Sequence, residues 1–321
     1  MGAARAVGDS RPARRPGQTL AAGLLTVLLA SLAGTTVAAS TAAPQPLCGR
    51  GPLEILLTND DGFDAVGVRA LAAGLAAAGH RVLLAAPDHN ASGTAMSFTW
   101  GDVRVTRDPA DPAVHAVSGS PATAVVLAAT ALYPPGRRPD LVVSGINHGP
   151  NSGALLMLSG TVGAAMAGTL LLDPPVPGIA VNAERLLASE PVDSPANRAH
   201  YQAVGAHVPR LIAAARGWFC RHGRVERART VLNVNYPARP LAELRGTVVT
   251  RQGSATGLRV TFEATPSGGY QARTSRTDAP DGRDTDNYWL GQGYVTVTPV
   301  SGLLDDDQAP RSDLAKRLGP L

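Results

Sequence analysis

The chain has 321 residues, with 29 lysines and arginines against 25 aspartates and glutamates, so its formal net charge is +4. A hydrophobic fraction of 44% and a charged fraction of 17% exclude a wholly disordered protein. Two cysteines exclude a disulfide-rich scaffold and a four-cysteine zinc site, and 4% of aromatic residues argues against a base-stacking nucleic-acid platform.

The amino-terminal segment, residues 1–42, has the pattern of a secretory signal peptide and its cleavage region. Four arginines and one aspartate precede residue 40, so most of the net positive charge lies here and the remainder does not indicate nucleic-acid binding. An apolar run follows at 20–33, and small residues come after it. Because this run is shorter than the roughly 20 residues of a spanning helix, we expect an exported protein with no stable membrane span after processing. An uncleaved anchor is the alternative.

Residues 43–52 are rich in proline and glycine and predict a linker. Cys48 lies in this linker, and Cys220 is the second cysteine. In an oxidising compartment the two thiols could pair. Two free thiols are the alternative, because the sequence does not give their separation.

The segment 53–245 predicts an α/β core with a parallel sheet. Short apolar runs at 53–58 and 81–86 are typical of buried parallel strands, and a helical pattern that ends at Gly79 lies between them. The alternation of helix and strand then continues, with helices at 121–132, 161–172 and 196–216 and strands at 140–144, 178–182 and 230–236.

After about residue 245 the pattern changes to short alternating strands. We expect strands at 247–251, 259–264, 269–273 and 294–299, and hence a β-rich carboxy-terminal extension, 246–300, that closes on the core. A polar tail, 301–321, completes the chain. The extension contains an acidic cluster that we interpret as a solvated loop, with a second metal site as the alternative: Asp278, Asp281, Asp284 and Asp286.

Three polar loops, at 59–62, 87–93 and 144–153, lie where ligands bind in an open α/β sheet. Because carboxyl ends of parallel strands meet at one edge, we expect these loops to face one site. The adjacent carboxylates of Asp60 and Asp61 repel each other, and a hard divalent cation would remove that cost. A plain turn or helix cap is the alternative.

A second group of polar residues lies at the start of the helix predicted near residue 161. Backbone N–H groups at a helix N-terminus suit a phosphate, and the hydroxyls of Ser159 and Thr161 add donors. The alternative is an ordinary N-cap. His89 and His148 lie in the polar loops and could act as acid or base. A cation site beside an anion site indicates a phosphoester substrate.

The sequence contains no phosphate-binding loop of the ATP type, no Gly-x-Gly-x-x-Gly dinucleotide motif and no His-Glu-x-x-His zinc motif. It also lacks the Gly-x-Ser-x-Gly elbow, which argues against an esterase.

At the polar loops the chain resembles the SurE family, the survival-protein nucleotidases. Four blocks carry the resemblance, in family order: ILLTNDDG at 55–62, APDHNASG at 86–93, VVSGINHGPN at 142–151 and SGTV at 159–162. Weaker matches at 118–122 and 293–299 extend it over most of the predicted mature chain.

The resemblance implies a Rossmann-like, three-layer core with a mostly parallel sheet and a C-terminal β-hairpin extension used in homodimer or homotetramer assembly. It implies a phosphomonoesterase that uses one divalent ion, Mg²⁺ or Mn²⁺, to hydrolyse nucleoside 5′- or 3′-monophosphates. Carried onto this sequence, the metal ligands are Asp60, Asp61, Ser92 and Asn147, with both aspartates also catalytic. The implied phosphate pocket comprises Asn59, Asn151, Ser159, Gly160 and Thr161.

The chain departs from the family pattern in the apolar stretch 154–157, where an acidic residue is usual, and in its leader. The implied ligand set is intact, so the apolar stretch bears on substrate preference and assembly. The alternative function is a secreted nucleotide- or phosphate-binding protein without turnover. Paired carboxylates argue against it, since they disfavour anions unless a metal is present.

Overall fold

The structure of the protein is a computed structural model that describes residues 45–277 and 281–302. The predicted leader, nearly all of the predicted polar tail, and Asp278 of the acidic cluster lie outside the described residues. Among the helices described, none combines the length and the apolar character needed to cross a membrane.

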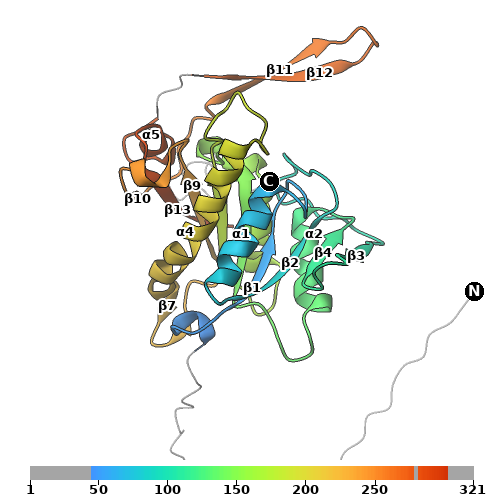
Figure 1. Ribbon diagram of the computed structural model, residues 1–321, viewed down its shortest axis with the longest axis vertical. Coiled ribbons are helices and arrows are strands. Elements are labelled where there is room, and N and C mark those ends of the chain that lie inside the picture. The colour runs from blue at the N-terminus through green and yellow to red at the C-terminus, as the bar shows by residue number, and fades with distance from the viewer. Residues whose placement is uncertain (1–44, 278–280, 303–321) are drawn as a thin grey trace, which may run out of the picture. The chain divides into compact units, whose positions relative to one another are not determined.

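A nine-stranded sheet forms the centre of the fold, in the order β10-β13-β9-β6-β5-β1-β2-β4-β3 (Figure 1). The strands are β1 (Glu54–Thr58), β2 (Arg81–Pro87), β3 (Val105–Arg107), β4 (Val114–Val117), β5 (Leu141–His148), β6 (Gly178–Ala183), β9 (Thr230–Tyr236), β10 (Thr247–Val249) and β13 (Val295–Ser301). Neighbours pair in parallel from β4 through β2, β1, β5 and β6 to β9. Antiparallel pairs occur only between β3 and β4 and between β9 and β13 among the described strands of this sheet. The predicted mostly parallel sheet is confirmed.

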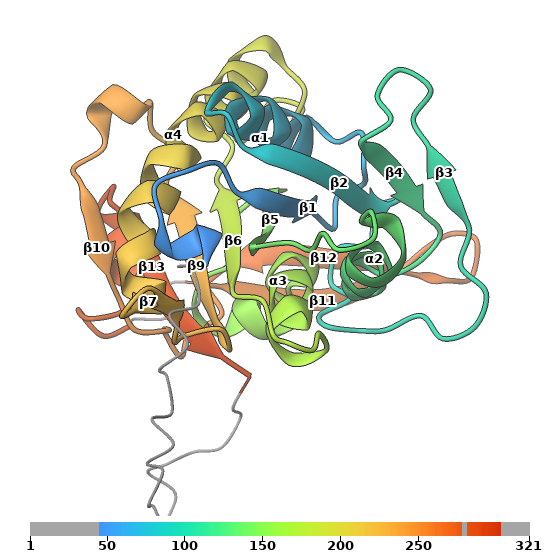
Figure 2. The same ribbon diagram turned by 90° about the horizontal axis from the view of Figure 1, so that it is seen from below.

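Two pairs of helices cover the two faces of the sheet (Figure 2). The helices α1 (Val66–Ala77) and α4 (Pro195–Phe219) lie on one face, and α2 (Pro121–Leu127) and α3 (Gly160–Leu170) on the other. Side chains alternate between the faces along β1: Ile55 and Leu57 join the α1–α4 core, and Leu56 joins the α2–α3 core. Burial on both faces explains why the strand is apolar throughout, and it confirms the three-layer architecture.

The helices differ from their predicted bounds at their ends. A π-helical segment, η2 (Ala128–Leu132), follows α2 and completes the stretch predicted as one helix. α4 runs about one turn further than predicted and crosses α1 closely, because Gly74 and Gly205 meet there. A Cβ atom on Gly74 would lie 2.1 Å from the carbonyl oxygen of Gly205, so the crossing requires glycine.

The predicted carboxy-terminal extension divides into two parts. β10 and β13 belong to the central sheet, so this sheet continues past residue 245. The strands β11 (Leu258–Ala264) and β12 (Tyr270–Arg276) pair only with each other, in a hairpin that projects from the rest (Figure 1). On this hairpin Phe262 and Tyr270 are largely exposed.

A short helix, α5 (Asp286–Gly291), was not predicted, and it contains the last residue of the acidic cluster. The interpretation of the cluster as a solvated loop is wrong for Asp286, which is fully buried. Its carboxylate accepts hydrogen bonds from the backbone N–H groups of Gly153 and Gly253, at 2.9–3.1 Å. Asp281 accepts from Ser254 and Asn287. Asp286 ties the segment before β13 to the loop after β5, and both carboxylates tie it to the segment after β10.

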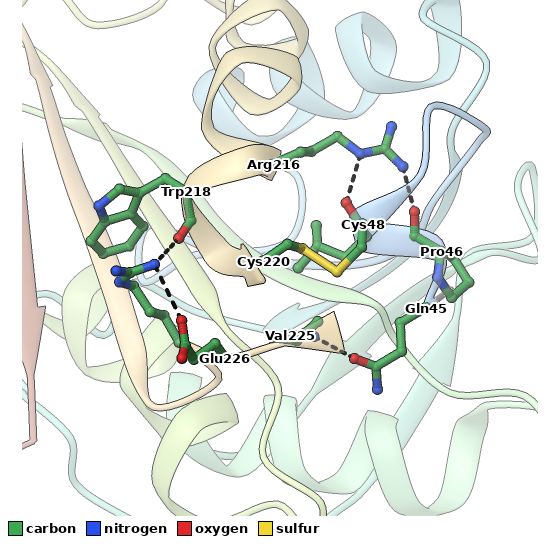
Figure 3. Close-up of a disulfide and its surroundings, with 10 residues drawn as sticks. Gln45, Pro46, Cys48, Arg216, Trp218, Cys220, Val225 and Glu226 are labelled. Carbon is green, nitrogen blue, oxygen red and sulfur yellow. Dashed lines mark hydrogen bonds and ion pairs between the residues drawn. A yellow bond between two sulfur atoms is a disulfide. The ribbon is translucent and has the colours of Figure 1, made fainter. Parts of the chain in front are cut away.

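The part of the predicted linker that the structure describes, from Gln45 onward, is held against the core. It forms a 3-10 turn, η1 (Pro46–Cys48), in which Leu47 is buried. Cys48 and Cys220 form a disulfide with a Cα–Cα distance of 5.7 Å (Figure 3). The pairing considered from the sequence is therefore confirmed.

Arg216, near the end of α4, reinforces this attachment. Its guanidinium donates hydrogen bonds to three carbonyl oxygens of the amino-terminal segment, those of Pro46, Leu47 and Gly51, at 2.6–3.0 Å. The side chain of Gln45 accepts from Val225, in the small hairpin of β7 (Cys220–Arg221) and β8 (Arg224–Val225) (Figure 3). This attachment lies at the amino ends of the parallel strands, opposite the edge where the polar loops lie.

Candidate metal and phosphate site

The structure brings the three predicted polar loops together at the carboxyl edge of the sheet. β1 pairs with both β2 and β5, so the loops that follow these strands are neighbours. The backbone N–H of Ala91 donates to the carbonyl oxygen of Asp60 at 2.7 Å. On the other side, the backbone N–H of His148 donates to Oδ2 of Asp61 at 3.2 Å. The two aspartates therefore lie between the second and third loops.

Asp60 is buried against the first turn of α3. Its Oδ1 accepts a 2.5 Å hydrogen bond from the hydroxyl of Thr161, and its side chain is 3% exposed. A Cβ atom on Gly160 would lie 2.8 Å from both Cβ and Oδ2 of Asp60, so this contact requires glycine. Burial raises the pKa of Asp60 above its usual value, although hydrogen bonds from Thr161 and from the backbone of Gly160 oppose the shift.

Asp61 is a second buried carboxylate beside the first. Burial, and then the negative charge of Asp60, raise the pKa of Asp61 to about 7, opposed by the hydrogen bond from the backbone of His148. Two adjacent carboxylates that both resist ionisation form a site at which a cation would relieve repulsion.

The side chain of His148 is a neutral imidazole that lies beside Asp61. Burial, and then the charge of Arg185, lower the pKa of His148 to about 4, so the ring is uncharged at neutral pH. The backbone N–H of Gly67 donates to Nε2 at 3.4 Å, which places the ring proton on Nδ1. Nδ1 lies 3.3 Å from Oδ1 of Asp61. The contact is therefore between a neutral ring and the carboxylate, rather than between two full charges.

The remaining predicted ligands, Asn147 and Ser92, lie in the two segments that bond to the aspartates. Asn147 donates its side-chain N–H to the carbonyl of Gly149 at 2.9 Å, which leaves its amide oxygen as the atom for a cation. Ser92 is exposed and follows Ala91, the residue bonded to Asp60. The amide oxygen of Asn59 is buried and has no hydrogen-bond partner among the described residues. Carboxylate, amide and hydroxyl oxygens suit a hard divalent cation, so these residues fit the implied metal.

The N-terminus of α3 contains three of the predicted phosphate residues, Ser159, Gly160 and Thr161. Ser159 is the N-cap, and its hydroxyl accepts from the backbone N–H of Val162 at 3.0 Å, so the ordinary cap considered as the alternative is present. Thr161, assigned by the resemblance to the phosphate pocket, directs its hydroxyl to Asp60. The helix N-terminus therefore contacts Asp60 directly, so the predicted phosphate residues and the predicted metal ligands are neighbours.

Asn151, the other predicted phosphate residue, is fixed by a network that the sequence analysis missed. Its backbone N–H donates to Asn235 at 2.8 Å, its side chain donates to Asn182 at 2.7 Å, and its carbonyl accepts from Asn233 at 2.7 Å. Asn182 also donates to Asn233 at 2.8 Å. The three partners are fully buried. Their signal in the sequence was asparagine within the otherwise apolar strands β6 and β9.

The two histidines of the polar loops are in different environments. His148 contacts the catalytic candidate Asp61, whereas His89 is 61% exposed and contacts Asp88 at 2.7 Å. Of the two, only His148 is held by bonds to an aspartate of the site.

Comparison with known proteins agrees with this geometry. The family model for the survival protein SurE matches residues 55–257. The 5′-nucleotidase SurE of Laribacter hongkongensis (strain HLHK9) is 37% identical over 253 residues, which cover 78% of this chain and 93% of that protein. The 5′/3′-nucleotidase SurE of Yersinia pestis (strain Pestoides F) is 36% identical over 253 residues, covering 77% and 89%. The crystal structure of the SurE protein from Aquifex aeolicus superposes with a TM-score of 0.66 at 30% identity, and covers 83% of this chain and all of that one. This chain belongs to the SurE family.

Proposed function

We propose that this protein is a metal-dependent nucleotidase that hydrolyses nucleoside 5′- or 3′-monophosphates to nucleoside and phosphate. The observation that carries the proposal is the buried carboxylate of Asp60, which contacts the N-terminus of α3 and is adjacent in sequence to the buried carboxylate of Asp61. A cation held by the carboxylates and an anion held by the helix would be neighbours, as a phosphomonoester requires. The names of the relatives, 5′-nucleotidase and 5′/3′-nucleotidase, support the same substrate class.

Four residues would hold one Mg²⁺ or Mn²⁺ ion: Asp60, Asp61, Ser92 and Asn147. When bound, such an ion polarises a phosphoryl oxygen and lowers the pKa of a coordinated water.

The chain's own groups supply orientation and charge stabilisation. Thr161 and Gly160 hold Asp60 in one position, and the backbone N–H of His148 holds Asp61. The dipole of α3, whose N-terminus lies at Asp60, would stabilise negative charge that develops on the phosphoryl oxygens. Asn151, fixed by its network, would donate a hydrogen bond to the phosphate. Because these groups are pre-positioned, little reorganisation accompanies the reaction.

We further propose that the protein is exported and forms a homodimer or homotetramer. The arginine-rich, apolar leader and the Cys48–Cys220 disulfide support export, since disulfides persist in oxidising compartments. The projecting β11–β12 hairpin, with exposed Phe262 and Tyr270, supports assembly through that element. Light scattering would test this by measuring the molecular mass of the mature chain and that of a variant without the hairpin.

The function is tested by phosphate release from a panel of nucleotides by the purified chain from about residue 43, with Mg²⁺, Mn²⁺ or EDTA. We expect metal-dependent release from AMP or GMP, and at least about 100-fold lower turnover in Asp60→Asn, the scale of losing a metal ligand. The control is Asp64→Asn, a change at an exposed aspartate of the same loop, which should retain activity. Near-wild-type activity in Asp60→Asn would contradict the assignment.

A binding protein without turnover is the second candidate, and calorimetry separates the two. A metal-free binder keeps its nucleotide in EDTA, whereas the proposed enzyme loses it when the carboxylates are left without a cation. Nucleotide binding in EDTA together with no phosphate release in any metal would favour the binding protein.

A further inference from the structure

A groove runs from His148, which neighbours the candidate catalytic centre, along the carboxyl edge of the sheet. It consists of two adjoining cavities, of about 430 and 740 Å³, which share Pro150, Glu184 and Ala238 in their walls. The smaller cavity is lined by His148, and the larger one extends to Leu290 in α5.

The near end of this groove lies at His148 and Gly149, which follow the predicted ligand Asn147. The imidazole of His148 lies 3.3 Å from Asp61, so the smaller cavity is one residue away from the carboxylate pair. Asn151 lies between Pro150 and Ser152, which both line the larger cavity. A phosphate held by Asn151 would therefore lie next to the larger cavity. The segments that follow β6 and β9 contribute Glu184 and Ala238 to the walls that the two cavities share, at the edge where open α/β sheets bind their ligands.

The walls of the larger cavity suit a flat, partly polar group. Leucines 155, 258 and 290 supply apolar surface, and Ser152 and Asn287 supply polar atoms that already bond to each other at 2.6 Å. Arg239 also lines the cavity, and its side chain lies against Gly293, where an added Cβ would approach Nε to 2.5 Å. Apolar side chains with a guanidinium group bind heteroaromatic rings by stacking. A sugar hydroxyl would find partners among the polar atoms.

We propose that this groove binds the nucleoside part of the substrate, with the base in the larger cavity between Leu155 and Arg239. The inference rests on the proposed nucleotidase function and specifies how that site selects nucleotides over simpler phosphomonoesters. It also gives a role to the apolar stretch 154–157, since Leu155 belongs to the wall. Binding energy from the base and the sugar would then orient the phosphate at Asp60 and Asp61.

The test compares AMP with phenyl phosphate, which has no sugar and no nucleobase. In Leu155→Arg and in Arg239→Ala we expect kcat/KM for AMP to fall about 10-fold, mainly through KM, while kcat/KM for phenyl phosphate changes less than about 2-fold. The matched controls are Leu171→Arg and Arg210→Ala, at exposed positions outside the groove, which should leave both substrates unchanged. Adenosine should inhibit phenyl phosphate hydrolysis by the wild type and about 10-fold less by the groove variants.

The possible outcomes distinguish a failure of the groove proposal from a failure of the proposed nucleotidase function. If kcat/KM falls equally for AMP and for phenyl phosphate in the groove variants, the groove proposal is wrong, although the protein is still a phosphatase. The groove proposal is also wrong if adenosine inhibits the variants as strongly as it inhibits the wild type. Calorimetric titration with adenosine measures the groove without turnover, so weak binding in the variants supports it even when catalysis is slow. If the wild type releases phosphate from neither substrate and binds no adenosine, the function and the groove fail together.

Discussion

The hydroxyl of Thr161 donates a 2.5 Å hydrogen bond to Oδ1 of Asp60 and so joins the first turn of α3 to the end of β1. The two residues are 101 positions apart in the sequence, and both are buried. The bond orients a carboxylate whose pKa burial has raised, and it comes from the same helix end that would bind phosphate. The proposed metal ligation and the proposed anion binding would thereby depend on one contact.

Replacement of Thr161 tests this contact. Thr161→Val removes the donor and keeps the shape, so we expect kcat to fall about 10- to 100-fold and the affinity for Mn²⁺, measured by calorimetry, to fall similarly. Thr161→Ser keeps the hydroxyl and should restore most of both quantities. The control is Thr169→Val in the same helix, because Thr169 is also buried but donates to the carbonyl of Met166. Equal activities in the Val and Ser variants at position 161 would contradict the role.

The glycine beside this contact gives a second prediction. Gly160→Ala places a methyl group 2.8 Å from the carboxylate of Asp60, so the aspartate must shift. We expect activity to fall at least about 100-fold, since a displacement of about 1 Å costs that much. The matched control is Gly217→Ala in α4, where an added Cβ meets no atom within 4 Å. This control should retain activity and raise the free energy of unfolding by up to about 1 kcal/mol. Wild-type rates in Gly160→Ala would contradict the contact.

The disulfide should govern stability and not catalysis. A double variant, Cys48→Ser with Cys220→Ser, opens a loop of 172 residues, and we expect the free energy of unfolding in urea to fall by about 2–5 kcal/mol. The bond lies at the amino ends of the strands, so kcat/KM of the folded variant should match the wild type. A loss of activity with unchanged stability would contradict this separation.

Glu54 predicts a dependence of stability on pH. Burial raises its pKa, but hydrogen bonds from Arg81 and Arg137 outweigh burial, so the pKa is lowered from 4.5. A depressed pKa means that the stabilisation is present above the unfolded value of 4.5 and is lost as the pH falls through the folded value. Glu54→Gln should therefore reduce the free energy of unfolding at pH 7, and the difference should shrink toward pH 3.

The control for this prediction is Glu263→Gln. Glu263 pairs with Arg273 on the exposed hairpin, where an ion pair contributes little. The two variants should differ at pH 7, and a difference from wild type that persists at pH 3 would contradict the assignment to Glu54.

The sequence predicted the parallel core well, because strands buried on both faces leave unbroken apolar runs such as 53–58. It also predicted that the polar loops meet, since parallel strands bring their carboxyl ends to one edge. The bond between Ala91 and Asp60 and the bond between His148 and Asp61 show this meeting. The roles of these residues came from the resemblance to a family and stay predictions.

Local sequence patterns could not predict the contacts between segments that are distant in the chain. β13 reaches the central sheet by pairing with β9, and no periodicity in residues 294–299 gives that partner. Asp286 is polar and lies in a glycine-rich stretch, yet it is fully buried because backbone N–H groups of two other loops bond to it. The asparagines of β6 and β9 were visible as residues, but only the folded sheet shows that they converge on Asn151.

The Cys48–Cys220 bond makes a covalent ring of β1 through α4, which includes every predicted metal and phosphate residue. A protease that cuts this ring once, at an exposed turn such as 109–112, leaves its fragments bonded to each other. Tension applied at the amino end would likewise pass through the sulfur bridge to the end of α4 and bypass the catalytic loops. A nicked or mechanically loaded molecule would thus keep its reaction centre in one piece.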